Sequence, residues 1–246
     1  MTWLKQAILP AVAAAFALAA IQYTNLDIRI ADHFYDPRSG HWIGTNTWWA
    51  STLLHDGARW MMRAIAFAAL LCWMVGYRLG ASQKQRRDAA FLALSIVVST
   101  TLVGFLKTVT NVDCPWDLSR YGGEMPMLPW FAPRPGNLPH AQCFPGAHSA
   151  SGFSLMCLYF LFGPPYSRKR WIGFAIGLAM GMTFSFAQQV RGAHFLSHDV
   201  MSAGLCWIVV ATLHFVLDSK RTTESRKLPG DSYEIQPRQP CRRLRR

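Results

Sequence analysis

The residues best suited to chemistry fall into three groups, each beside an apolar segment. The first group is headed by Lys107 and the second by His148. The third combines Arg191, His194 and Asp199. Cations can clamp a phosphate, one histidine can supply a proton, and a second histidine oriented by a carboxylate can attack phosphorus. The pattern indicates phosphoryl transfer without a metal, and hence a phosphatase.

The composition places these groups in a membrane protein. Of 246 residues, 51% are hydrophobic and only 15% are charged. A transmembrane helix needs about 20 apolar residues to cross about 30 Å of hydrocarbon. The fourth candidate is short, so its first turn should include part of 145–150. We expect an all-α, polytopic protein with six transmembrane helices, at 4–23, 61–77, 89–106, 151–162, 171–187 and 200–217.

The first of these segments also resembles a secretory signal, with Lys5 before an apolar run that ends near Ala-Leu-Ala-Ala. The polar loop that follows it leads into five more spans. This arrangement favours an uncleaved anchor over a cleaved signal.

The basic residues set the expected orientation. With both termini on one side, that side holds 17 of the 25 lysines and arginines, and the other holds 8. Such an excess marks the cytoplasmic side of a membrane. We expect a multi-pass protein of the bacterial inner membrane, with cytoplasmic termini and all three polar groups at the periplasmic face. The net charge of +12 therefore gives no indication of nucleic-acid binding.

Two outward loops and one tail complete the expected organisation. The membrane domain covers 1–218, with outward loops at 24–60 and 107–150. The second loop holds seven of the fourteen prolines, which block regular helix, so we expect an ordered irregular cap. The segment 219–246 is polar and basic, which indicates a disordered cytoplasmic tail that sets topology or touches anionic lipid. Three aromatic residues favour order in the cap: Trp116, Trp130 and Phe131.

Two cysteines lie in the second outward loop. An oxidising compartment would permit Cys114 and Cys143 to form a disulfide that ties the first polar group to the second. The alternative is that they bind a metal together with His140 or His148, although no short Cys/His pair has zinc-like spacing.

The first two polar groups each have an ordinary structural interpretation. Lys107 ends the third span, where a lysine commonly extends to the membrane surface. His148 follows Pro145-Gly-Ala and precedes the fourth span, where Gly146 and Ala147 would let backbone N–H groups approach a phosphate. The alternative is a helix-capping segment that happens to contain a histidine.

The third group is the most informative, because ionisable residues at membrane depth are usually functional. A neutral His194 oriented by Asp199 could attack phosphorus and hold the phosphoryl group. His198, adjacent to Asp199, is a competing nucleophile. The structural alternative is a polar turn that only connects two helices.

Together the three groups resemble the type 2 phosphatidic acid phosphatase superfamily, the membrane relatives of acid phosphatases and haloperoxidases. Its motifs are Lys, six residues, Arg-Pro; then Pro-Ser-Gly-His; then Ser-Arg, five residues, His, three residues, Asp. Here they read Lys107-(six residues)-Cys-Pro, Pro-Gly-Ala-His148, and Ala-Gln-(five residues)-His194-(four residues)-Asp199. The resemblance covers about 89–217 and implies a helical bundle of the same kind.

This chain departs from the family pattern at three positions. Cys114 and Gln188 stand where the family has arginine, and Asp199 is one residue farther from His194. Arg191, about one helical turn after Gln188, could supply one missing charge.

The resemblance implies roles for the site residues. His194 would attack phosphorus and form a phosphohistidine, and Asp199 would orient it. His148 would protonate the leaving oxygen, while Lys107 and Arg191 would hold the phosphate. It also implies no metal, no cofactor, and a lipid phosphate or diphosphate substrate.

Several rivals remain open. A lipid phosphotransferase of the same fold would look the same, and a degenerate, non-enzymatic descendant would explain Cys114 and Gln188. A transporter would tend to show repeated halves or discontinuous helices, and the sequence shows neither. The lipid, like the oligomeric state, is not determined by the sequence.

Overall fold

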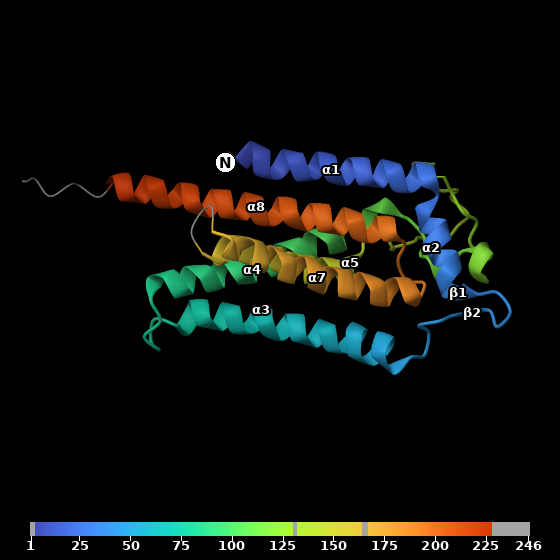
Figure 1. The fold of residues 1–246 in the computed structure, drawn as a ribbon, viewed down its shortest axis with the longest axis horizontal. Coiled ribbons are helices and arrows are strands. Elements are labelled where there is room, and N and C mark those ends of the chain that lie inside the picture. The colour runs from blue at the N-terminus through green and yellow to red at the C-terminus, as the bar shows by residue number, and fades with distance from the viewer. Residues whose placement is uncertain (1–2, 130–131, 164–166, 228–246) are drawn as a thin grey trace, which may run out of the picture.

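A bundle of long helices makes up the protein (Figure 1). The structure is a computed structural model that describes residues 3–129, 132–163 and 167–227. The strands within these residues form one antiparallel ribbon of β1 (Tyr35–Asp36) and β2 (His41–Trp42), so the fold is all-α as expected. The helices are α1 (Trp3–Thr24), α2 (Leu26–Phe34), the π-helical η1 (Trp49–Gly57), α3 (Ala58–Val75), α4 (Gln83–Thr110), the 3₁₀ turns η2 (Pro115–Asp117) and η3 (Ser119–Tyr121), α5 (Ala147–Phe153), the 3₁₀ turn η4 (Ser154–Cys157), α6 (Leu158–Leu161), α7 (Lys169–Val190) and α8 (Leu196–Lys227).

Five of the described helical segments are long and apolar enough to cross a membrane, which confirms a multi-pass membrane architecture. They contain or overlap five of the six expected spans. Their bounds are Gln6–Thr24, Trp49–Val75, Gln83–Asp117, Lys169–Val190 and Leu196–Asp218.

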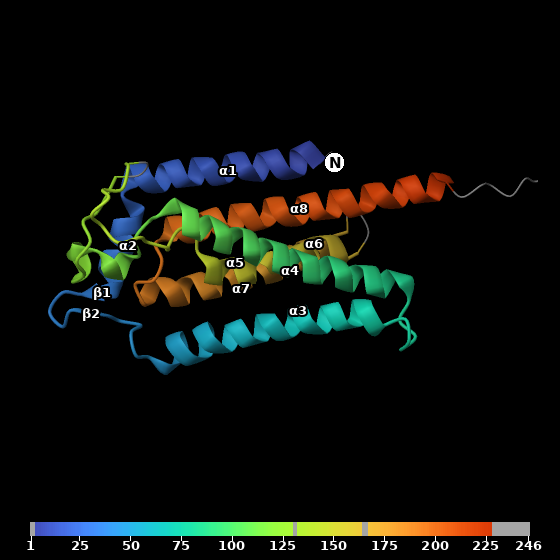
Figure 2. The same ribbon diagram turned by 180° about the vertical axis from the view of Figure 1, so that it is seen from behind.

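The expected fourth span, 151–162, is a broken helix instead. It begins at Ala147, as its shortness suggested, and passes through α5, η4 and α6 to Leu161. These 15 residues reach only about 22 Å, short of the roughly 30 Å of a bilayer core. The hydroxyls of Ser151 and Ser154 donate to backbone carbonyls three residues earlier, an interaction that competes with regular helix. Figure 2 shows α5 nearer the loop-rich end and α6 nearer the opposite end.

Small residues let this broken helix lie inside the bundle. Gly173, Gly177 and Gly181 recur every four residues along one face of α7. A Cβ on Gly177 would collide with the backbone of Leu155 and Met156. Close approach through a small-residue seam is how membrane helices commonly pack. The seam sets the depth at which α5 enters the site.

The second span begins at Trp49, so the expected start at residue 61 was wrong. Polar residues between Trp49 and residue 61 lower the hydropathy of this stretch. They do not interrupt the helix, because several of them line an internal cavity. The expected outward loop 24–60 is therefore shorter, and it consists largely of α2 and the β-ribbon.

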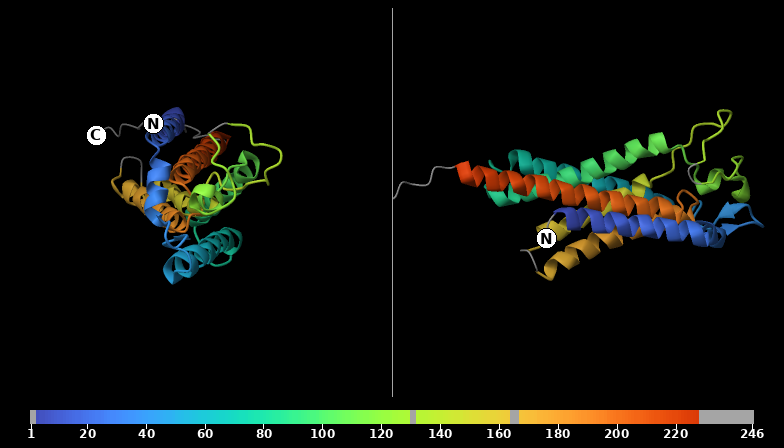
Figure 3. Two further views of the ribbon diagram at one scale, coloured as in Figure 1. Left: turned by 90° about the vertical axis from the view of Figure 1, so that its right-hand side faces the viewer. Right: turned by 90° about the horizontal axis from the view of Figure 1, so that it is seen from above.

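The outer helices frame the bundle. Viewed from the loop-rich end, α1 and α3 lie on opposite sides (Figure 3). The first contacts α8 and the second contacts α4. The indole Nε1 of Trp207 donates to the carbonyl of Gln6 at 2.7 Å, which fixes α1 against α8.

At its far end α8 continues to Lys227, so the segment expected to be disordered from residue 219 begins as helix. The remainder of that predicted tail, 228–246, lies outside the described residues, as do Trp130 and Phe131.

Candidate active site

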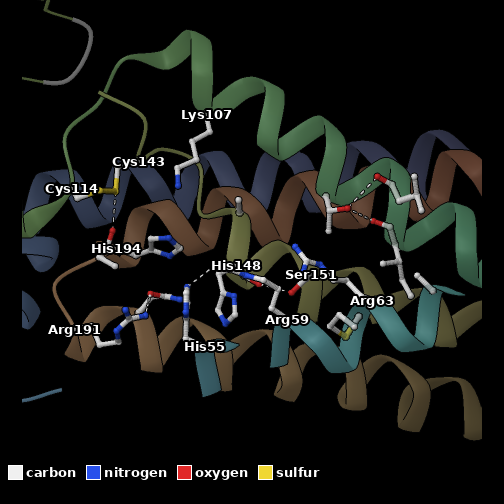
Figure 4. A pocket seen from close by; sticks show the side chains of 18 of the residues that line it. His55, Arg59, Arg63, Lys107, Cys114, Cys143, His148, Ser151, Arg191 and His194 are labelled. Atoms are coloured by element: carbon white, nitrogen blue, oxygen red, sulfur yellow. Dashed lines mark hydrogen bonds between the residues drawn. A yellow bond between two sulfur atoms is a disulfide. The ribbon is translucent and has the colours of Figure 1, made fainter. Parts of the chain in front are cut away.

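All three polar groups face one cavity of about 540 Å³ near the loop-rich end (Figure 4). Its walls come from α3, α4, α5, the loop after α4, and the turn between α7 and α8. Lys107, His148, Arg191 and His194 line it. The sequence therefore identified four residues that the fold brings together from three separate places, namely α4, α5 and the turn between α7 and α8.

The best-defined contact in the site joins His194 to Asp199. The imidazole Nδ1 lies 2.8 Å from Oδ1 of the carboxylate. The second carboxylate oxygen accepts a hydrogen bond from Nε2 of Gln189 at 2.8 Å. Both His194 and Asp199 are buried. A carboxylate held at both oxygens fixes the tautomer and ring orientation of its histidine, so Nε2 is the nitrogen left to react.

Local backbone geometry explains how His194 reaches that position. Gly192 has φ of +74° directly after the end of α7. Its N–H bonds the carbonyl of Gln189, and the N–H of Ala193 bonds that of Gln188. This pair of bonds is the Schellman pattern that ends helices at a left-handed glycine. It turns the chain so that His194 faces back toward the cavity.

Asp27, from the distant helix α2, anchors the start of α8. Its Oδ1 accepts the backbone N–H of Ser197 at 2.9 Å, close to Asp199 in the same turn. Burial raises the pKa of Asp27, although the hydrogen bonds from Ser197 act in the opposite direction. A carboxylate that accepts a free N–H at a helix N-terminus stabilises that terminus. Asp27 therefore helps to hold Asp199 in place.

His148 lies at the start of α5 and is held by a backbone carbonyl. Its Nε2 donates to the oxygen of Leu54 in η1 at 2.8 Å. Burial lowers the pKa of His148 to about 4, and the neighbouring rings of His55 and His194 act in the same direction. His148 is therefore neutral at pH 7, with Nδ1 able to take a proton.

One of the two family arginine positions has a nearby arginine in the fold. Gln188 accepts a hydrogen bond on Oε1 from Nη1 of Arg191 at 3.1 Å, and both side chains line the cavity. Gln188 therefore positions the arginine that follows it by one turn. Burial lowers the pKa of Arg191, while the nearby charge of Asp56 raises it.

Cys114, at the other arginine position, forms a disulfide with Cys143. The sulfur of Cys143 lies 2.8 Å from the carbonyl oxygen of Ala193. The backbone N–H of Trp116 bonds the carbonyl of Gly192 at 2.9 Å. The disulfide therefore holds the cap against the turn that carries His194.

One expected phosphate contact needs correction, and the competing nucleophile His198 lies away from the cavity. The N–H of Gly146 donates to the carbonyl of His198 at 3.1 Å, so it is not free to bind phosphate, whereas Ala147 does line the cavity. A Cβ on Gly146 would lie 2.7 Å from the ring of His194, so this glycine provides space instead. His198 does not line the cavity; it is buried against Phe144, and its Nδ1 is unpaired among the described residues.

Three further cavity residues lie on one helical face and were not among the candidates from the sequence: His55, Arg59 and Arg63. They recur at intervals of four, which is the spacing of neighbours on a helix. Nη2 of Arg59 lies 3.0 Å from Nε2 of His55. The ring of His55 lies 4.9 Å, centroid to centroid, from that of His148. This spacing crosses the boundary between the expected loop 24–60 and the expected span 61–77, so it was not recognised as one helical face.

Comparison with known proteins gives one match. A family model described as the PAP2 superfamily matches residues 88–221. The matched residues include the three polar groups, α5 to α7 and most of α8. They do not include α3, which carries Arg59 and Arg63. No curated protein and no solved structure matches the chain.

Proposed function

The chain belongs to the PAP2 superfamily, and on that premise we propose that it is a metal-independent membrane phosphatase acting on a lipid phosphate or diphosphate. Membership confirms the resemblance of the three motifs and supports phosphatase-type chemistry in general. The observation that carries the finer proposal is the buried His194–Asp199 pair facing a cavity that also holds Lys107 and Arg191.

The proposed first step transfers the phosphoryl group to His194. Its Nε2 attacks phosphorus, a nitrogen–phosphorus bond forms, and the bond from phosphorus to the leaving oxygen breaks. Lys107 and Arg191 stabilise the charge on the phosphoryl oxygens. A bound phosphate anion raises the pKa of His148, so this residue takes up a proton with the substrate and passes it to the leaving oxygen.

The second step returns the enzyme to its starting state. Water attacks the phosphohistidine, His148 takes the proton released by the water, and the nitrogen–phosphorus bond breaks. Inorganic phosphate leaves, and His148 releases its proton to solvent, so that it is neutral again before the next substrate binds. Asp199 stabilises the imidazolium of His194 that each transfer passes through.

The walls of the cavity support a lipid substrate. Between α3 and α4 they are apolar, with Met62, Ala66, Ile96 and Val97. A polar head can occupy the cationic part of the cavity while the hydrocarbon chain stays beside these residues and the bilayer. The partners of the site would be membrane lipids alone.

The location follows from charge distribution. The loop-rich end that holds the site is the end with fewer basic residues, so the positive-inside rule supports a periplasmic site. Both termini would then lie in the cytoplasm of a bacterium, with the protein in its inner membrane.

The test is phosphate release from a panel of lipid phosphates by detergent-purified protein with chelator present. We expect release that His194→Ala abolishes and that His41→Ala, a control at an exposed histidine of β2, leaves intact. No release above the His194→Ala level for any lipid would overturn hydrolysis. It would favour transfer to a lipid acceptor or the degenerate descendant that Cys114 and Gln188 suggest.

A further inference from the structure

Two arginines lie deep in a membrane span and still face the catalytic cavity. Arg59 and Arg63 belong to the segment Trp49–Val75, ten and fourteen residues after Trp49. Charged side chains at such depth are costly to keep and are usually tied to function. Neither forms an ion pair with a carboxylate among the described residues. Both line the cavity instead.

The charge of the cavity exceeds what one phosphate needs. Its lining contains four permanent cations and, among the described residues, no aspartate or glutamate. The proposed function assigns Lys107 and Arg191 to the transferred phosphoryl group. The second pair, Arg59 and Arg63, therefore has no anionic partner unless the ligand brings one.

Arg59 and Arg63 also lie on a particular side of the cavity relative to His148. In Figure 4, His148 stands between His194 on one side and Arg59 and Arg63 on the other. Arg59 reaches His148 through the ring of His55, which contacts both. In phosphoryl transfer the attacking and leaving groups lie roughly in line across phosphorus. A leaving group in line with Nε2 of His194 would therefore extend past His148 toward the two arginines.

The role of the two arginines depends on the charge of the leaving group. An alcohol protonated by His148 leaves as a neutral group and gains little from two further cations. A phosphate leaves as an anion, and guanidinium groups bind phosphate with paired, charge-assisted hydrogen bonds. Only a phosphate leaving group would therefore interact favourably with the two arginines of α3.

We propose that Arg59 and Arg63 form a subsite for a second phosphate, and that the preferred substrate is a lipid diphosphate. This rests on the proposed function. The bond that breaks joins the terminal phosphorus to the bridging oxygen, and the phosphoryl group passes to Nε2 of His194. The bridging oxygen leaves with the lipid monophosphate, whose charge Arg59 and Arg63 stabilise. Water then releases inorganic phosphate from His194.

The experiment compares a polyprenyl diphosphate with the monophosphate of the same chain length. The variants are wild type, Arg59→Gln, Arg63→Gln and the double variant, with Arg29→Gln as a control at an exposed arginine outside the cavity. Wild type should favour the diphosphate by about tenfold or more in kcat/KM. The double variant should lose most of that preference, with less than roughly threefold change on the monophosphate.

A preference for the monophosphate in wild type, or an equal loss on both lipids in the double variant, would overturn the subsite. Failure of the proposed function looks different, because wild type would then release no more phosphate from either lipid than His194→Ala does.

A binding measurement keeps the subsite testable without turnover. In the His194→Ala background, Arg59→Gln with Arg63→Gln should weaken binding of the diphosphate lipid about tenfold and leave binding of the monophosphate nearly unchanged. Equal affinities for the diphosphate with and without the two arginines would contradict the proposal, whatever the enzyme hydrolyses.

Discussion

Nδ1 of His194 lies 2.8 Å from Oδ1 of Asp199 although four residues separate the two, one more than in the family motif. The extra residue is accommodated because His194 precedes α8, which begins at Leu196, while Asp199 lies in the first turn of that helix. The chain folds back between them, so the contact depends on the turn geometry and not on fixed helical spacing.

Removing the charge of Asp199 should disable catalysis with little effect on binding. Asp199→Asn keeps the shape but stabilises the wrong tautomer of His194, so we expect kcat to fall by about 100-fold or more. Gln189→Leu removes only the second support of the carboxylate, and a loss of about tenfold is expected. Steady-state kinetics on one lipid phosphate measures both. A change confined to KM in Asp199→Asn would contradict the orienting role.

Asp27 should stabilise the fold mainly as a hydrogen-bond acceptor and less through its charge. Asp27→Ala removes the partner of the Ser197 N–H and should cost about 1–2 kcal/mol of stability. Asp27→Asn keeps an acceptor oxygen and should lose less.

The pH dependence follows from the raised pKa of Asp27. The folded state binds a proton there more tightly than the unfolded state, so the stability contributed by the protonated form is lost as pH rises through the folded pKa. The apparent Tm of Asp27→Asn relative to wild type should therefore be higher at pH 7 than near pH 4. A difference that grows on acidification would contradict this sign.

Gly192 is required both for its backbone angle and for space. Its φ of +74° lies in the left-handed region, and a Cβ there would collide with the indole of Trp42. Gly40 is a matched control, because its φ is +70° but nothing lies near its missing Cβ. Gly40→Ala should cost about 1 kcal/mol from strain alone, and Gly192→Ala clearly more, with loss of activity. Equal thermal stabilities of the two variants would argue against the Trp42 contact.

The Cys114–Cys143 disulfide should support activity because it holds the cap, the loop 107–150, against the turn that carries His194. Cys114→Ser with Cys143→Ser releases the cap from the turn at Ala193, and we expect roughly a tenfold loss in kcat/KM. Cys72→Ser, at a free cysteine distant in sequence, is the control. Reductant should lower the activity of wild type and leave the double variant unchanged. Full activity of the double variant would show that the cap needs no tether.

The sequence located the polar residues that share the cavity better than the remaining walls of that cavity. Lys107, His148 and His194 were found because their motif order reflects the order of the helices that carry them. Asp27 was missed because its contact with Ser197 spans 170 positions, and nothing local in the sequence indicates it.

The two errors in the helices have a common cause. Hydropathy assumes that a span faces lipid, but the broken helix from Ala147 to Leu161 is enclosed by its neighbours, and the polar start of the second span faces a cavity. Arg59, in the expected loop, and Arg63, in the expected span, were counted only as charges of the outward side for the same reason. Which side of a helix meets a cavity is decided by packing, not by composition.

The central claim is that His194 carries the phosphoryl group, and the most direct test traps that state. Lipid phosphate labelled with ³²P is mixed with enzyme, quenched in alkali after milliseconds and digested, and the labelled peptide is mapped. We predict an alkali-stable, acid-labile phosphohistidine on His194 that is absent from His194→Ala. Label on His198 or on any other residue, or turnover with no labelled protein at any time, would contradict the account.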